Sequence, residues 1–160
     1  MPKLVIVNST PLIALASIGE LDILKSVYGQ ITIPVAVFNE VTVKNGKVAD
    51  AIKSADWISV KEVQDSESKK MYKAKLHAGE VEVMILAQEM DADVVIIDDN
   101  AAKKTAEYLG LNAVGTMAVL LKAKEIGSIT EVSSFIGKIV ADGFFISSEV
   151  IKIVKDLAGE

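Results

Sequence analysis

The residues that decide the fold are VVIIDDN, at positions 94–100. Four consecutive β-branched residues form a run typical of a strand that is buried on both faces. Two carboxylates, Asp98 and Asp99, follow this run without a break. Leu4–Val7 repeats the arrangement near the N-terminus and leads directly into Asn8. Strands of this kind belong to parallel sheets, so we predict a mostly parallel sheet covered by helices.

Segments with helical and strand-like patterns alternate along the chain, which favours an α/β fold with one layer of helices on each side of the sheet. The expected strands lie at 4–7, 31–33, 57–60, 94–97 and 112–114. The expected helices lie at about 10–18, 21–28, 34–43, 48–55, 78–90, 99–109 and 116–126, with a weak helix or mobile segment at 67–75 and two more helices after Ser128 and from Ser147.

Hydroxyl residues are expected to cap three of these helices, because Ser and Thr side chains accept hydrogen bonds from free N–H groups at helix starts. Ser9 or Thr10 would cap the first helix. Ser128 would form a capping box with Glu131. Ser147 would start the last helix.

Length and composition indicate one domain over residues 1–160, in a cytoplasmic protein. The chain has 160 residues and is 51% hydrophobic, and a domain of this size buries roughly two-thirds of the surface of its unfolded chain. No apolar run reaches the roughly 18 residues of a membrane span. The apolar N-terminus resembles the start of a signal peptide, but residues 8–11 interrupt it before it reaches export length.

The ionisable residues exclude several classes of site. The chain has no cysteine, which excludes disulfides, thiolate nucleophiles and cysteine-bound zinc. Its one histidine, His77, cannot build a multi-histidine metal site and is expected at the surface or its boundary. All 17 basic residues are lysines and the net charge is −5, which argues against a reader of duplex DNA. The lysine clusters at 69–75 and 103–104 are interpreted as solvated helix faces.

Glu80 is the acidic residue whose helical position is most informative. It shares a stripe with Val83, Met84 and Ala87, which should face the core, and a carboxylate there needs a partner or a cation. Alternatively, Glu80 is a first-turn glutamate favoured by the helix dipole. Glu82 points the other way and is expected to be solvated.

The adjacent carboxylates Asp98 and Asp99 repel one another unless something positive joins them, and a divalent cation is a natural partner. The alternative is that Asp99 caps the following helix while Asp98 is solvated. Glu40, which lies between Val37 and Val41 on its helix, is a weaker candidate that could also point inward. Trp57 is expected in the core.

The order and spacing of these motifs resemble the PIN domain, over essentially the whole chain. The similarity is greatest to a prokaryotic branch related to the toxin nucleases of toxin–antitoxin pairs. It implies a three-layer α/β/α fold with a mostly parallel central sheet. The motifs that carry it are VIVNSTPLIAL at 5–15, AGEVEV at 78–83, IIDDN at 96–100, GL at 110–111, VGT at 114–116 and LLKAK at 120–124.

The resemblance also implies an activity, namely Mg²⁺- or Mn²⁺-dependent hydrolysis of single-stranded or structured RNA. Metal ions in such a site activate a water and stabilise charge on the phosphate and the leaving oxygen. Ser9 or Thr10 would orient a water or a ligand. By the same resemblance, the catalytic residues would be Glu40, Glu80, Asp98 and Asp99, and the metal ligands would be Asn8, Glu80, Asp98 and Asp99.

Asn8 departs from the family pattern, which has aspartate at this position. An amide oxygen can still bind a hard cation, but one negative charge is missing and the amide cannot accept a proton. We therefore expect weakened metal affinity and reduced or absent cleavage. The alternative function is that of a catalytically silent PIN-like domain that binds RNA or a protein partner.

Other readings of the acidic residues are less favoured. A receiver-like phosphorylation domain would carry its acid pair after the first strand, whereas this pair follows a late one. A dinucleotide-binding domain would need a glycine-rich turn after Leu4–Val7.

The high apolar content predicts a homodimer. Phe144, Phe145 and Ile146 could form its interface or the docking place of an antitoxin-like protein. The alternative is that both phenylalanines complete the core.

Overall fold

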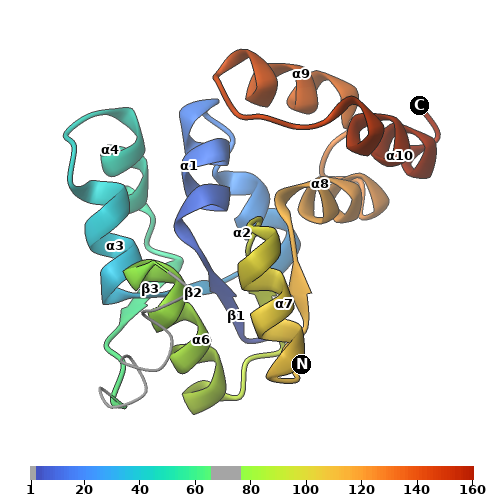
Figure 1. Ribbon diagram of the computed structural model, residues 1–160. Helices are drawn as coiled ribbons and strands as arrows, with labels where there is room; N and C mark the ends of the chain where they lie inside the picture. Colours follow the sequence, from blue (N-terminus) through green and yellow to red (C-terminus); the bar gives the residue numbers. More distant parts are fainter. Residues whose placement is uncertain (1–2, 66–76) are drawn as a thin grey trace.

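The computed structural model describes residues 3–65 and 77–160. Its centre is a five-stranded sheet in the order β3-β2-β1-β4-β5, in which every strand pair is parallel (Figure 1). This confirms the predicted parallel sheet. The strands are β1 (Val5–Val7), β2 (Ile31–Pro34), β3 (Ile58–Lys61), β4 (Val94–Ile96) and β5 (Ala113–Val114).

The strand order reverses between β1 and β4. The chain adds β2 and β3 on one side of β1 and then returns to place β4 and β5 on the other side. Val5 pairs with Val94 and Val7 with Ile96, so the two strands end at the same edge of the sheet. In open α/β sheets such a reversal leaves a crevice at the carboxyl ends of the two strands, where ligands bind.

Helices cover both faces of the sheet, as expected for three layers. In Figure 1, α6 and α7 lie in front of the sheet and α2 lies behind it. Helix α6 contacts β1, β2 and α3, whereas α2 contacts β2 and α8. The helices are α1 (Ser9–Ser17), α2 (Asp22–Tyr28), α3 (Val35–Thr42), α4 (Lys47–Ser54), α6 (Ala78–Met90), α7 (Asn100–Tyr108), α8 (Thr116–Glu125), α9 (Ser133–Ala141) and α10 (Ser148–Ala158).

The core lies between these layers and explains the continuous apolar strands. Ile6, Val95 and Ile33 are fully buried because helices cover the sheet on both sides. Trp57 is 8% exposed and packs into the same core, as expected. In the parts of the chain that the structure describes, no helix is long and apolar enough to cross a membrane. The lysine cluster at 69–75 and the helix considered at 67–75 lie outside the described residues.

Two of the predicted helix caps are wrong. Helix α1 begins at Ser9, so Ser9 and Thr10 lie inside it and Asn8 occupies the cap position. Helix α9 begins at Ser133, beyond Ser128 and its proposed capping box. Ser147 does cap α10, since its Oγ accepts from the Val150 N–H at 3.2 Å.

Glu160 satisfies the first turn of α9 in place of Ser128. Its carboxylate accepts hydrogen bonds from the Val132 N–H at 2.8 Å and the Ser133 N–H at 3.0 Å, and it pairs with Lys124 at 2.9 Å. The Ser133 hydroxyl donates to it as well. A partner from the far end of α10 is a tertiary contact that local sequence patterns do not reveal.

Candidate functional site

Asn8 stands at the reversal of the strand order. It follows the last residue of β1, and its N–H donates to the Ile96 carbonyl of β4 at 2.9 Å. The residue is 5% exposed. Its side-chain amide does not cap α1 and has no hydrogen-bond partner in the described parts of the chain. A nearly buried amide without a protein partner is suited to a water, an ion or another small ligand.

Glu40 reaches the same place from α3. Its residue is exposed overall, yet its Oε2 accepts a hydrogen bond of 2.8 Å from the Ser9 hydroxyl. Ser9 therefore holds the Glu40 carboxylate next to the start of α1. This contact agrees with the expectation that Glu40 could turn inward, and it gives Ser9 a positioning role instead of a capping role.

Gly79 in the first turn of α6 makes room for both side chains. A Cβ on Gly79 would lie 2.9 Å from Glu40 Oε2, 3.7 Å from Asn8 Oδ1 and 3.5 Å from Val37 Cγ2. The oxygens of Asn8 and Glu40 therefore converge against backbone that carries no side chain. Sequence reasoning missed Gly79, although a glycine directly before the candidate Glu80 was a signal that could have found it.

Glu80 is buried as its helical stripe predicted, with 9% exposure. Its Oε1 accepts from the His77 N–H at 3.1 Å, so the carboxylate satisfies the free start of α6. This matches the first-turn interpretation of Glu80. His77 itself is exposed, as expected.

Glu82 was expected to be solvated, and that expectation is wrong. Its residue is half-buried, and Oε1 accepts from the Ala36 N–H at 3.0 Å in the first turn of α3. The free N–H groups and partial positive charge of a helix start attract a carboxylate. The helical pattern of α6 gave no indication of this contact, because Ala36 is far away in sequence.

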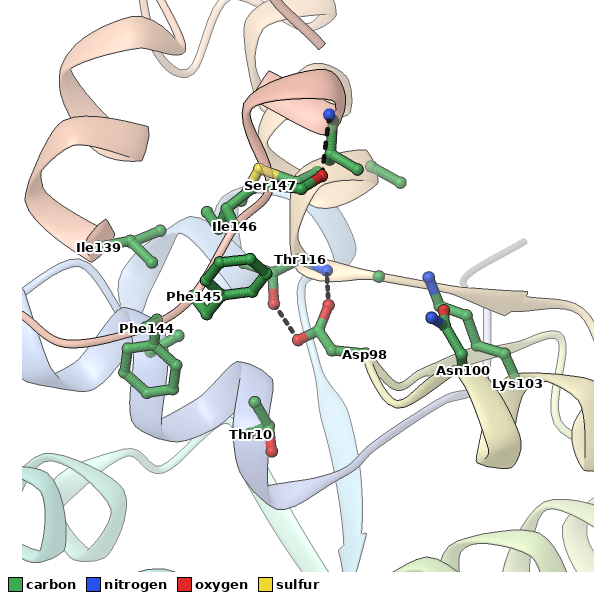
Figure 2. A pocket seen from close by; sticks show the side chains of 15 residues that line it. Thr10, Asp98, Asn100, Lys103, Thr116, Ile139, Phe144, Phe145, Ile146 and Ser147 are labelled. Carbon is green, nitrogen blue, oxygen red and sulfur yellow. Dashed lines mark hydrogen bonds between the residues drawn. The ribbon is translucent and has the colours of Figure 1, made fainter. Parts of the chain in front are cut away.

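The two carboxylates that follow β4 have different partners. Asp99 caps α7, since its Oδ2 accepts from the Ala102 N–H at 2.9 Å. The alternative interpretation placed the Asp98 carboxylate in solvent. That placement is wrong, because both Asp98 oxygens accept hydrogen bonds from Thr116. The Thr116 N–H lies 2.8 Å from Oδ1 and the Thr116 hydroxyl lies 2.6 Å from Oδ2 (Figure 2). Asp98 thus ties the end of β4 to the start of α8.

A cavity of about 500 Å³ opens beside Asp98. It lies against the first turns of α7 and α8 and against the segment from Phe144 to Ser147. Phe144 is half-buried and packs on the core, whereas Phe145 is 90% exposed, so the alternative that both complete the core holds only for Phe144. The polar residues that line the cavity are Thr10, Asp98, Asn100, Lys103, Thr116 and Ser147.

Lys103 and its neighbour Lys104 have different surroundings. Lys103 is half-buried and lines the cavity wall, whereas Lys104 is exposed as expected. A Cβ on Gly115 would lie 2.8 Å from Asp98 Oδ1 and 2.9 Å from Lys103 Nζ. Gly115 therefore leaves space for a carboxylate and an ammonium group side by side, which neither lysine spacing nor composition indicated.

The chain matches a family described as PIN domain (DUF3368) over residues 4–160. It belongs to this PIN-domain family. No curated protein matches the chain. The family assignment confirms the resemblance drawn from the ordered motifs and agrees with the three-layer parallel fold.

The acidic residues of this PIN domain divide into separate groups. Asn8 and Glu40 converge at Gly79, Glu80 bonds to backbone at the start of α6, and Asp98 and Asp99 bond to the starts of α8 and α7. Among the described residues, no three His, Cys, Asp or Glu side chains are grouped closely enough to hold a metal ion.

The Asn8–Glu40 pair nevertheless provides a partial fit to a divalent cation. The Asn8 amide oxygen has no hydrogen-bond partner within residues 3–65 and 77–160, and Glu40 Oε2 faces the same Gly79 backbone. Mg²⁺ keeps several waters and needs only one or two carboxylates from the protein. The pair therefore suits a weakly held, largely hydrated ion better than a tight protein cage.

Proposed function

We propose that this PIN domain is a metal-dependent endoribonuclease whose activity is weakened by Asn8. The observation that supports the proposal most directly is the convergence of Asn8 and Glu40 at the strand reversal, at the same edge of the sheet as the residues that follow β4. Membership of the PIN family supports a nuclease-type fold. RNA is the proposed substrate, and Mg²⁺ or Mn²⁺ is the proposed cofactor.

In this proposal Asn8 and Glu40 hold the ion, and Glu80, Asp98 and Asp99 act with Glu40 in catalysis. When bound, a divalent ion would supply an acidified water and neutralise charge on the phosphate. Ser9 orients the Glu40 carboxylate through its hydrogen bond of 2.8 Å.

The expected weakness of metal binding follows from the charge that Asn8 lacks. Asparagine offers one neutral oxygen where an aspartate would offer a charged one, and hard cations are held most strongly by carboxylates. Two opposite charges about 4 Å apart attract by about 4 kcal/mol at an effective dielectric constant of about 20. Loss of one ligand charge is therefore large enough to weaken the affinity for the metal substantially.

The test is cleavage of RNA in the presence of Mn²⁺. Asn8→Asp should raise the cleavage rate above that of the wild-type chain, because it restores the missing ligand charge. The control is Glu80→Gln, which keeps an oxygen to accept from the His77 N–H but removes the charge. It should abolish cleavage while preserving the fold, and persistence of cleavage would indicate a contaminating nuclease. If the wild type is already active and Asn8→Asp leaves its rate unchanged, Asn8 does not belong to the site.

A catalytically silent PIN-like domain is the second candidate. It is favoured by the hydrogen bonds that Asp98 and Asp99 make to helix starts, because these give both carboxylates a structural role without a metal. In that case Asn8→Asp would be inactive and Mn²⁺ would not change its melting temperature. The domain would then act by binding RNA or a protein partner.

We also propose a homodimer in the cytoplasm, and an antitoxin-like protein as a further partner. The support is an apolar stripe on α10, where Val150, Ile153 and Leu157 are 40%, 57% and 71% exposed. These residues lie at spacings of three and four and so share one helix face. Light scattering after gel filtration should show a dimer, and Ile153→Glu should convert it to a monomer. A monomeric wild type would contradict the dimer.

A further inference from the structure

Phe145 is an exposed aromatic side chain that lines the cavity beside Asp98. It is 90% exposed, and burying a phenylalanine side chain is worth roughly 1.5–3 kcal/mol. Phe145 lines this cavity together with Thr10 and Thr116, and in the view of Figure 2 these two polar residues appear on either side of its ring. An exposed aromatic face at a cavity lined by both apolar and polar residues is available to a planar ligand.

Lys103 supplies a cation to the same cavity. In the view of Figure 2, the Phe145 ring lies on one side of Asp98, and Lys103 and Asn100 lie on the other. Lys103 forms no ion pair with any residue in the described ranges. Asp98 is already engaged by two hydrogen bonds from Thr116, so Lys103 is available to an anionic ligand.

The cavity thus combines an aromatic face, a free ammonium group and hydrogen-bonding side chains in about 500 Å³, within the range of small-ligand sites. These are the elements of a nucleotide site, in which aromatic rings stack on bases and lysines neutralise phosphates. A base within a duplex is stacked on both faces and cannot pack on Phe145. The combination therefore favours a nucleotide that is unpaired.

We propose that this cavity binds one unpaired nucleotide of an RNA strand, with its base stacked on Phe145 and its phosphate at Lys103. The inference rests on the proposed function, because it takes RNA as the ligand. The cavity shares Asp98 with the candidate catalytic set, so the bound nucleotide lies next to the phosphate to be cleaved. The site would position single-stranded RNA and disfavour duplexes.

The first test measures binding of a single-stranded RNA of about ten nucleotides by fluorescence anisotropy, with EDTA present so that cleavage does not contribute. Phe145→Ala should weaken binding by about tenfold, which lies within the range for loss of one stacked base. Phe145→Trp should retain binding. The matched control is Tyr108→Ala, because Tyr108 is also 90% exposed but does not line the cavity. It should bind like the wild type.

The second test separates the phosphate contact from stacking. Lys103→Ala should reduce the slope of log affinity against log salt by about 0.7, as expected for loss of one contact to single-stranded nucleic acid. Lys104→Ala is the control, since Lys104 is adjacent, exposed and outside the cavity. It should leave the slope unchanged. A 2-aminopurine base in the RNA should be quenched by the wild type and not by Phe145→Ala.

Equal affinities of the Phe145→Ala and Tyr108→Ala variants would overturn the proposal, as would duplex RNA that binds as tightly as the single strand. Absence of binding by the wild type would overturn it as well, and would leave the cavity as a surface for a protein. These outcomes are independent of catalysis, because cleavage is measured separately in Mn²⁺. A chain that binds through Phe145 but never cleaves would retain this inference and lose the proposed nuclease activity.

Discussion

Replacement of Gly79 by alanine tests the convergence of Asn8 and Glu40 directly. The new methyl group would lie 2.9 Å from Glu40 Oε2, a separation that real Cβ atoms do not tolerate. The same oxygen accepts the hydrogen bond from Ser9 at 2.8 Å. Because Glu40 Oε2 is at the end of a flexible side chain, we expect the carboxylate to move away and the bond to Ser9 to break.

The expected magnitude is a balance of two effects. Alanine is favoured over glycine in a helix interior by about 0.8–1 kcal/mol, and by less in the first turn, where Gly79 lies. A hydrogen bond to a charged group contributes about 1.5–3 kcal/mol, and the exposure of Glu40 favours the lower value. The Gly79→Ala variant should therefore lose about 1 kcal/mol of unfolding free energy. For a chain of this length that corresponds to roughly 2–4 °C in melting temperature.

Gly137→Ala is the matched control. Gly137 lies in the interior of α9 and is exposed, and in the described parts of the chain no atom beyond its own neighbouring helix backbone lies within 4 Å of its would-be Cβ. This variant should gain about 0.5–1 kcal/mol, because the helical preference of alanine is unopposed. Urea denaturation in EDTA, followed by circular dichroism, would give both values. The two variants should differ by roughly 2 kcal/mol.

A double-mutant cycle identifies the cause. In a Glu40→Ala background the collision is absent, so Gly79→Ala should become neutral or slightly stabilising. If Gly79→Ala stabilises the wild-type chain as much as Gly137→Ala does, the Glu40 carboxylate does not lie against α6. The proposed pairing of Glu40 with Asn8 would then be wrong.

Three further predictions concern single residues. In thermal unfolding with EDTA, Asn8→Asp should lower the melting temperature, because a second carboxylate near Glu40 repels the first. Mn²⁺ should restore the melting temperature of this variant, and no response to Mn²⁺ would exclude a metal at Asn8. Asp99→Ala should cost about 1 kcal/mol of stability in urea unfolding through loss of the cap on α7, whereas Asp99→Asn should keep the cap and lose only cleavage; equal stability losses would contradict this. Hydrogen bonds from Ser133, Val132 and Lys124 lower the pKa of Glu160 from 4.5 to about 2, so its stabilisation is present above pH 4.5 and is lost as the pH falls towards 2. The protection of backbone amides at the start of α9 against hydrogen exchange, taken relative to the intrinsic exchange rate at each pH, should fall across that range, and in Glu160→Ala it should be low at every pH.

Local sequence was sufficient wherever a residue's environment depends on its own helix or strand. The apolar runs before Asn8 and Asp98 predicted buried parallel strands, because only a sheet covered on both faces accommodates them. The stripe on α6 predicted that Glu80 is buried. For Asp99 the sequence left two interpretations open, a metal ligand or a helix cap. The hydrogen bond that Asp99 accepts from the Ala102 N–H, within the next turn, shows that it caps α7.

Local sequence failed where the partner comes from elsewhere in the chain. Glu82 was assigned to solvent, but α3 presents its free N–H groups opposite it. Ser9 was assigned to a cap, but its hydroxyl donates to Glu40, 31 residues away. Hydrogen-bond partners at helix starts depend on how helices pack against one another. The periodic pattern of apolar residues in the sequence does not indicate this packing.

By itself, the sequence determined the parallel α/β fold, the PIN family and the polar residues that follow β1 and β4. These properties depend on hydrophobic patterns and ordered motifs, which are encoded in neighbouring residues. Only the tertiary structure decided that Asn8 and Glu40 meet at Gly79, that Asp98 is tied to Thr116, and that Phe145 faces the same cavity as Lys103. The physical reason is that strand order and helix packing bring together side chains that are remote in the chain. Their separations in space cannot be predicted from the residues that neighbour each of them in the sequence.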